Sequence, residues 1–312
     1  MKLAFVFPGQ GSQAVGMMKG FDGHPAVRAT FDEASAVLGE DLWALVTNGP
    51  EEALDLTVNT QPVMLTAAVA VWRAWQAAGG PRPALVAGHS LGEYSALVAS
   101  GALAFRDALP LVRFRAQAMQ EAVPPGAGAM AAILGADDDA VAAACRKAAG
   151  DGVVEPVNFN APGQLVIAGD RAAVERAMQA AKEAGARRAV MLPVSAPFHS
   201  SLLKPAAERL AQRLAEVPFT APAIPVVHNV DVAQHADAAA IRTALAQQAA
   251  SPVRWTQTIR AFAAAGVTHV VECGPGKVLA NLVKRIDDRL EALALTSGSM
   301  LDDALAQLRE SA

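Results

Sequence analysis

The most informative stretch of this chain is Ala84-Leu85-Val86-Ala87-Gly88-His89-Ser90-Leu91-Gly92-Glu93-Tyr94. Its apolar start predicts a strand, its Gly-x-Ser-x-Gly pattern predicts a tight turn, and helix-forming residues follow at once. A serine on such a turn exposes its hydroxyl above the edge of the sheet, and the helix that starts there directs unpaired backbone N–H groups at the same place. We therefore expect Ser90 to be a nucleophile. The alternative is a serine that only caps the helix.

Strand and helix patterns alternate along the whole chain, which predicts an α/β fold with a mainly parallel sheet. We expect its strands at residues 3–7, 85–87, 225–228 and 268–272. Helical patterns lie between them, near residues 60–78, 91–100, 105–122 and 201–217.

The region from 128 to 194 follows a different order. Its patterns predict strand 130–134, helix 137–149, strand 153–158, strand 164–168, helix 172–184 and strand 189–192. A turn at Asn160-Ala161-Pro162-Gly163 joins the two central strands as a hairpin. This β-α-β-β-α-β order is that of a ferredoxin-like unit. We therefore expect an inserted small subdomain over 127–197 and a discontinuous large domain formed by 1–126 and 198–312.

The composition argues against several classes of protein. A formal net charge of −4 does not suit a nucleic-acid-binding surface. Cys145 and Cys273 fit no disulfide or metal pattern, so we expect both to be buried and no metal to be bound. The apolar N-terminus is interrupted at Pro8-Gly9, and the longest apolar stretch is too short for a bilayer, which predicts neither a signal peptide nor a membrane span. A soluble, cytoplasmic protein is expected.

A nucleophilic serine needs a general base, and the chain has six histidines. Five of them are expected on the surface, in a polar loop, within or beside strands, or pointing away from the serine: His24, His235, His228, His269 and His89. The sixth, His199, closes the loop at the exit of the predicted subdomain, from which it can reach the serine turn. Its position alone leaves the catalytic and the structural role equally open.

The loop Phe7-Pro8-Gly9-Gln10-Gly11-Ser12-Gln13 follows the first predicted strand. Glycine on both sides of Gln10 lets the backbone approach a ligand closely. The loop lacks the lysine of a phosphate-binding loop and fits no dinucleotide motif. A backbone N–H that donates to an oxyanion suits it better, and a plain tight turn is the alternative.

The predicted helix 105–122 carries Arg113 and Arg115. Residues two apart on a helix point to different faces, so one arginine can face solvent while the other faces inward. An inward arginine could hold a carboxylate, because its planar fork matches two oxygens. The helical pattern alone favours solvent exposure for each of them.

Five motifs together resemble those of one family: Phe-Pro-Gly-Gln-Gly-Ser-Gln at 7–13, Gly-His-Ser-Leu-Gly-Glu-Tyr at 88–94, Asn-Ala-Pro-Gly-Gln at 160–164, Pro-Phe-His-Ser at 197–200 and Glu-Cys-Gly-Pro-Gly-Lys-Val-Leu at 272–279. The chain resembles the malonyl-CoA:acyl carrier protein transacylases of bacterial type II fatty acid synthesis over essentially its whole length. This resemblance implies an α/β-hydrolase-like core with a ferredoxin-like insert. It also implies ping-pong transfer of a malonyl group through a malonyl-serine, without cofactor or metal, by a monomer whose partners are malonyl-CoA and holo acyl carrier protein rather than nucleic acid or membrane.

The resemblance assigns the chemistry to four residues. Ser90 matches the nucleophile, and His199 matches its base. Gln10 and Leu91 match the residues whose backbone N–H groups form the oxyanion hole.

It further assigns substrate selection. Arg115 matches the arginine that pairs with the malonyl carboxylate. Gln248 matches a glutamine that helps to orient the histidine, although Ala249 stands where leucine often follows it. Phe198 would narrow the pocket against a 2-methyl branch. The carrier protein of the family is acidic, so docking would need a basic patch, for which there are six candidate cations: Lys182, Arg187, Arg188, Lys204, Lys277 and Lys284.

Other functions remain open at this point. A malonyl loader of a polyketide synthase, or the transacylase subunit of a malonate decarboxylase, would use the same chemistry. A serine thioesterase would share the serine turn, but the sequence shows no clear acid in Ser…Asp…His order. A fourth hypothesis is a non-enzymatic module that docks the carrier protein and has only a vestigial active site.

Overall fold

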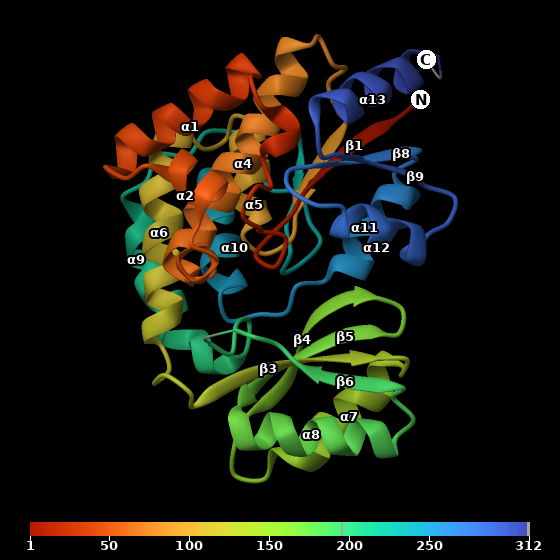
Figure 1. The fold of residues 1–312 in the computed structure, drawn as a ribbon. Coiled ribbons are helices and arrows are strands. Elements are labelled where there is room, and N and C mark those ends of the chain that lie inside the picture. Colours follow the sequence, from red (N-terminus) through yellow and green to blue (C-terminus); the bar gives the residue numbers. More distant parts are fainter. Residues whose placement is uncertain (195, 311–312) are drawn as a thin grey trace.

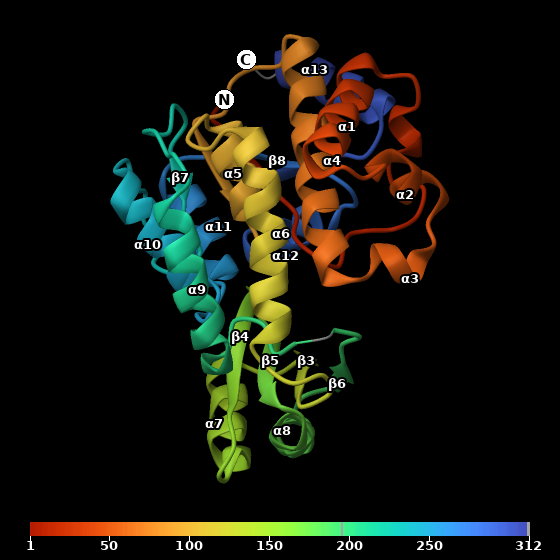
Figure 2. The same cartoon turned by 90° about the vertical axis from the view of Figure 1, so that its left-hand side faces the viewer.

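The computed structural model describes residues 1–194 and 196–310 (Figures 1 and 2). Its larger sheet has five parallel strands in the order β7 (Val226–Val227), β2 (Leu85–Gly88), β1 (Leu3–Phe7), β8 (His269–Cys273) and β9 (Glu291–Leu295). Its smaller sheet has four antiparallel strands in the order β4 (Val154–Ala161), β5 (Gln164–Asp170), β3 (Gly128–Leu134) and β6 (Arg188–Met191).

The helices before the small sheet are η1 (Lys19–Phe21, a 3-10 helix), α1 (Pro25–Leu38), α2 (Leu42–Asn48), α3 (Glu51–Leu54), α4 (Thr57–Ala77), α5 (Gly92–Ala99) and α6 (Phe105–Glu121). Within the small subdomain lie α7 (Asp138–Ala149) and α8 (Arg171–Glu183). After it follow η2 (Ser201–Leu203, also 3-10), α9 (Lys204–Ala215), α10 (Ala238–Gln248), α11 (Trp255–Ala264), α12 (Val278–Ile286) and α13 (Gly298–Glu310).

The central strand β1 is buried on both faces, because its alternating side chains enter two different cores. Phe5 and Phe7 pack into the core that holds the apolar faces of α1, α4, α5 and α6. Ala4 and Val6 face the opposite core, which α11 and α12 cover. Figure 1 shows these two helix layers on either side of the parallel sheet.

The small sheet lies beyond one end of the large domain, with α7 and α8 packed together on its outer face (Figure 1). The alanine-rich sides of these two helices and alternate residues of β3 and β5 form a third core. The chain order β-α-β-β-α-β and the strand order β4-β5-β3-β6 are those of a ferredoxin-like unit.

The predicted fold class is therefore confirmed, with a parallel sheet and an inserted antiparallel unit. The helix expected over 201–217 starts instead as η2 and becomes α-helical at Lys204, because Pro205 in the first turn suits a helix start. Strand β9 was not expected from the sequence. The division at 126/127 and 197/198 falls in the segments before β3 and after β6 and stays a prediction.

No helix among the described residues is both long enough and apolar enough to span a bilayer.

Candidate active site

Ser90 lies on a sharp turn between β2 and α5, with a left-handed backbone of φ 53°. The flanking glycines are required by close backbone contacts. A Cβ on Gly88 would lie 1.8 Å from the carbonyl carbon of Gly92, and one on Gly92 would lie 2.0 Å from the carbonyl oxygen of Phe7. The helix-cap alternative for Ser90 is wrong, because Leu91 is the N-cap of α5 and no side chain caps it.

The hydroxyl of Ser90 lies 2.7 Å from Nε2 of His199. The other ring nitrogen, Nδ1, lies 2.8 Å from the main-chain carbonyl oxygen of Gln248. A carbonyl oxygen only accepts hydrogen bonds, so Nδ1 carries the proton and Nε2 presents its lone pair to Ser90. The histidine is therefore held in the tautomer that can take the proton of the serine.

Electrostatics keep this histidine neutral. Burial lowers the pKa of His199 to about 3, and the positive charge of Arg115 acts in the same direction, whereas the hydrogen bond to Gln248 opposes them. His199 also has a left-handed backbone, with φ 66°. Non-glycine residues in this region typically cost about 1–3 kcal/mol each and persist where the surroundings hold them. Ser90 and His199 are thus both held in strained conformations.

Arg113 and Arg115 point to different faces of α6, as expected. Arg113 forms a two-pronged ion pair with Glu40 near the surface. Arg115 is 2% exposed, so the expectation of solvent exposure was wrong for it. Burial is tolerated because the amide oxygens of Gln61, at 2.8 Å, and Gln248, at 2.9 Å, accept from its guanidinium.

The guanidinium of Arg115 also donates to the hydroxyl of Ser90 at 3.1 Å. Among the described residues no ion pair includes it. Burial lowers the pKa of Arg115, although the nearby Tyr94 and Glu93 act against this shift. A buried cation without a paired carboxylate therefore lies beside the Ser90 hydroxyl.

These groups line a cavity of about 110 Å³ between the large domain and the small sheet. Its walls are formed by Gln10, Gln61, His89, Ser90, Leu91, Arg115, Met119, Met130, Asn158, Leu192, Val194, Phe198 and His199. A larger surface groove lies between α1, α6 and α9, but it contains neither the serine nor the histidine. The small cavity is therefore the candidate active site.

The two residues matched to the oxyanion hole lie next to each other in space. The loop after β1 packs so closely on the turn that a Cβ on Gly9 would lie 2.5 Å from the carbonyl oxygen of His89. No hydrogen bond among the described residues takes up the backbone N–H of Gln10 or Leu91. Both donors are thus available at the cavity.

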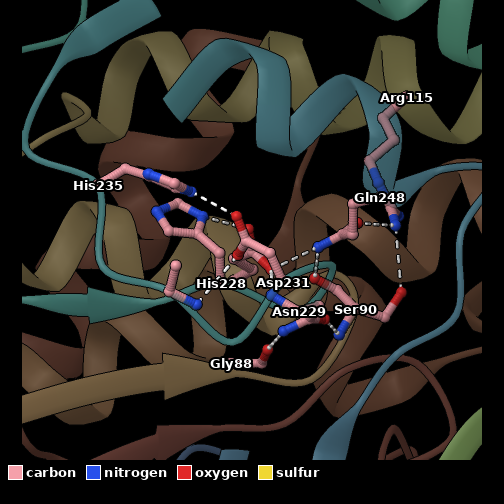
Figure 3. A network of polar contacts seen from close by, with 10 residues as sticks. Gly88, Ser90, Arg115, His228, Asn229, Asp231, His235 and Gln248 are labelled. Carbon is pink, nitrogen blue, oxygen red and sulfur yellow. Dashed lines mark hydrogen bonds and ion pairs between the residues drawn. The ribbon is translucent and has the colours of Figure 1, made fainter. Parts of the chain in front are cut away.

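Among the described residues, the Gln248 side chain forms no hydrogen bond with His199. Its amide nitrogen donates to the Ser90 carbonyl oxygen at 2.9 Å and to Glu93 at 3.0 Å, while its amide oxygen faces Arg115. Figure 3 shows Gln248 between Ser90 and Arg115. Gln248 thus orients the histidine through its main chain and the arginine through its side chain.

Asn229 was not predicted from the sequence as a residue of the site. Its amide oxygen accepts from the Ser90 N–H at 2.8 Å, and its amide nitrogen donates to the Gly88 carbonyl at 2.7 Å, so it holds both sides of the turn (Figure 3). Its position could have indicated a role in the site. Asn229 directly follows the strand expected at 225–228, and the carboxyl ends of parallel strands meet at the edge of the sheet where ligands bind. Gln61, the partner of Arg115, was also missed, since nothing in its helical context marks it.

The small subdomain is fastened to the large domain beside the site. Phe159 and Val253 are joined by a backbone hydrogen bond of 3.0 Å. His89 points away from Ser90, as expected, to the side chain of Asn160 at 2.8 Å. Glu155 accepts from the backbone N–H and the hydroxyl of Ser201, at 2.7 and 2.8 Å, two residues beyond His199.

Other expected residues lie away from the cavity. Cys145 and Cys273 are buried, as expected. The six candidate docking cations are all exposed, but they lie in or beside four elements of both subdomains, namely α8, β6, α9 and α12. The described residues contain no cluster of His, Cys, Asp or Glu that could hold a metal ion.

A family model described as "Acyl transferase domain" matches residues 4–296. The chain belongs to this acyl transferase family. It is 57% identical to the malonyl CoA-acyl carrier protein transacylase of Salmonella typhimurium, over 98% of this chain and 99% of that protein.

Solved structures agree with this placement. An acyl-carrier-protein S-malonyltransferase from Burkholderia pseudomallei is 63% identical, with a TM-score of 0.97 and coverage of 98% of this chain and 100% of that one. A malonyl transacylase in complex with its type II polyketide synthase acyl carrier protein is 52% identical, with a TM-score of 0.97 and the same coverage. The fold and the family are therefore those that the sequence motifs imply.

Proposed function

We propose that this enzyme transfers the malonyl group of malonyl-CoA to the phosphopantetheine thiol of acyl carrier protein. The observation that carries the proposal is the buried guanidinium of Arg115, 3.1 Å from the hydroxyl of Ser90 and without a carboxylate partner among the described residues. A malonyl group places a carboxylate one carbon from the thioester carbonyl. A substrate attacked by Ser90 can therefore pair its carboxylate with Arg115.

The first half-reaction forms a malonyl-serine. His199 takes the proton of Ser90 while the serine oxygen attacks the thioester carbonyl, and the backbone N–H groups of Gln10 and Leu91 hold the developing oxyanion. The carbon–sulfur bond then breaks, and His199 returns its proton to the thiolate of coenzyme A as it leaves.

The second half-reaction runs the same chemistry with a different thiol. His199 takes the proton of the phosphopantetheine thiol, whose sulfur attacks the ester of the malonyl-serine. When the carbon–oxygen bond breaks, the proton returns to Ser90 and malonyl-carrier protein leaves.

Arg115 would supply the selection for malonyl groups. A hydrogen bond to a charged group typically contributes about 1.5–3 kcal/mol, which corresponds to roughly 10- to 150-fold in rate or affinity. An acetyl group offers no carboxylate and leaves the buried guanidinium unpaired. Phe198, 8% exposed and on the cavity wall, would narrow the site against a 2-methyl branch.

The resemblance to transacylases of fatty acid synthesis supports that pathway as the destination of the product. Loading of a polyketide synthase carrier is a second candidate, because one similar structure is a complex with such a carrier. We further propose that the enzyme acts in the cytoplasm as a monomer and needs no cofactor.

A product assay tests the proposal. The enzyme is incubated with malonyl-CoA and either a fatty acid synthase carrier or a type II polyketide carrier, each bearing its phosphopantetheine arm. Malonyl-carrier formed faster than free malonate supports transfer, and preference for the first carrier supports the fatty acid pathway. Free malonate formed faster than malonyl-carrier would identify a thioesterase.

A further inference from the structure

Glu93 is a fully buried carboxylate in the first turn of α5, three residues after the nucleophile. One oxygen lies 2.8 Å from Nδ1 of His228. The other accepts from the backbone N–H of Asn229 at 2.9 Å and from the amide nitrogen of Gln248 at 3.0 Å. Among the described residues, the carboxylate forms no hydrogen bond with Ser90, Arg115 or His199.

The partners of Glu93 are themselves fixed. His228 is fully buried, and although burial lowers its pKa, the charge and hydrogen bond of Glu93 outweigh this and raise the pKa overall. Asn229 holds the two sides of the serine turn. Glu93 therefore connects His228 and Asn229, which holds the serine turn, to the amide of Gln248.

The amide of Gln248 has only one productive orientation. Its NH₂ group lies between two acceptors, the carboxylate of Glu93 and the carbonyl oxygen of Ser90. Its oxygen is consequently turned toward Arg115, which has only donors. A rotated amide would set its oxygen against two acceptors and its NH₂ against a donor.

We propose that Glu93 is a positioning residue for malonyl selection, which acts by fixing the amide of Gln248 so that its oxygen holds Arg115 toward Ser90. An ionised carboxylate accepts from all three neighbours at once. Glutamine at this position would have one accepting oxygen, and its NH₂ group would either face the donors of Asn229 and Gln248 or turn Nδ1 of His228 into an acceptor. In both cases Gln248 would lose its ionised acceptor, which weakens the preference that fixes its amide and, through it, the alignment of Arg115. This inference rests on the proposed malonyl transfer.

The test compares Glu93→Gln and Gln248→Met, singly and together, by the ratio of kcat/KM for malonyl-CoA to that for acetyl-CoA. Gln248→Met keeps the main-chain carbonyl that binds His199, so it removes only the side-chain role. We expect each single variant to lower the malonyl-to-acetyl ratio at least about tenfold, and Glu93→Gln to change it less than about threefold when Gln248 is already Met. Glu93→Asp, which keeps the acceptors, is expected to retain most of the ratio.

The matched control is Glu272→Gln, because Glu272 is also fully buried but lies in β8, where it accepts from the backbone N–H of Ala280 in the first turn of α12. It is expected to lower stability without changing the ratio. A folded Glu93→Gln with the wild-type ratio, or with an equal loss in both backgrounds, overturns the inference. If Glu93→Gln does not fold, a folded Gln248→Met with the wild-type ratio overturns it. A wild-type enzyme that loads no carrier would instead refute the proposed function.

Discussion

The imidazole Nδ1 of His199 donates to the main-chain carbonyl oxygen of Gln248 over 2.8 Å, in the place where many serine hydrolases have a carboxylate. A carbonyl fixes the same tautomer but brings no negative charge to stabilise the imidazolium. Burial and the nearby Arg115 lower the pKa of His199 and keep it neutral, and the hydrogen bond to this carbonyl only partly opposes them. The site therefore has an oriented, neutral histidine without the carboxylate partner usual in serine hydrolases.

The first prediction concerns stability and pH. The pKa of His199 is about 3 in the folded protein and 6.5 ordinarily, so between these values the unfolded chain binds more protons. Stability contributed by the neutral histidine is complete above pH 6.5 and is lost as the pH falls toward 3. His199→Gln should remove this dependence.

Urea unfolding of wild type and His199→Gln at about pH 7.5 and about pH 4.5 measures the effect. Other groups titrate alike in both proteins. At each pH, the free energy of unfolding of the variant is therefore subtracted from that of wild type, and the change of this difference with pH reports the titration of His199. We expect wild type to lose more stability than the variant. A difference that is the same at both pH values would contradict the assigned pKa shift.

The second prediction is that Arg115→Ala weakens malonyl transfer roughly 10- to 150-fold and relaxes selection against acetyl-CoA, because the carboxylate loses its charged partner. Steady-state kinetics with both acyl-CoA substrates measure the ratio. Arg113→Ala is the matched control, since that arginine pairs with Glu40 outside the cavity and should leave the ratio unchanged. An unchanged malonyl-to-acetyl preference in Arg115→Ala would rule out the role.

The third prediction concerns the 2-methyl branch. Phe198→Ala enlarges the cavity beside His199 and should raise kcat/KM for methylmalonyl-CoA relative to malonyl-CoA by about 5- to 150-fold, since one methyl group is worth about 1–3 kcal/mol. Competition between the two substrates measures it directly. Phe114→Ala on the outer side of α6 serves as control. If the preference does not move, Phe198 is only a packing residue.

The fourth prediction concerns the carrier. Reversal of charge at Arg187 and Arg188 should raise KM for the acidic carrier but not for malonyl-CoA, because both are exposed on the small subdomain. Lys19→Glu with Arg309→Glu changes the net charge equally at exposed positions of the large domain. Equal increases in both KM values, or the same effect in the control, would place the docking surface elsewhere.

The fold could be predicted from the sequence because the patterns that indicate its strands, turns and helices are local. The apolar run before Ser90 and the hairpin turn at Pro162-Gly163 each define their neighbours by simple pattern. Strand β9 escaped prediction because its residues at the sheet edge are only partly buried and show no clear alternation.

The site could be predicted only in part, because its contacts join residues that are far apart in the sequence. The burial of Arg115 depends on Gln61 and Gln248, which are 54 and 133 residues away in the chain. No helical pattern encodes such partners, so the sequence pattern favoured solvent exposure. The resemblance to a family supplied the role of Arg115, and the structure supplies the contacts.

A malonyl-serine intermediate is tested most directly by the mass of the intact protein after brief exposure to malonyl-CoA, followed by addition of carrier protein bearing its phosphopantetheine arm. We predict a gain of one malonyl group, mapped to Ser90, absent from Ser90→Ala, and passed to the carrier. A malonyl adduct on Ser90→Ala would contradict a malonyl-serine intermediate. So would a wild-type enzyme that loads the carrier but shows no adduct.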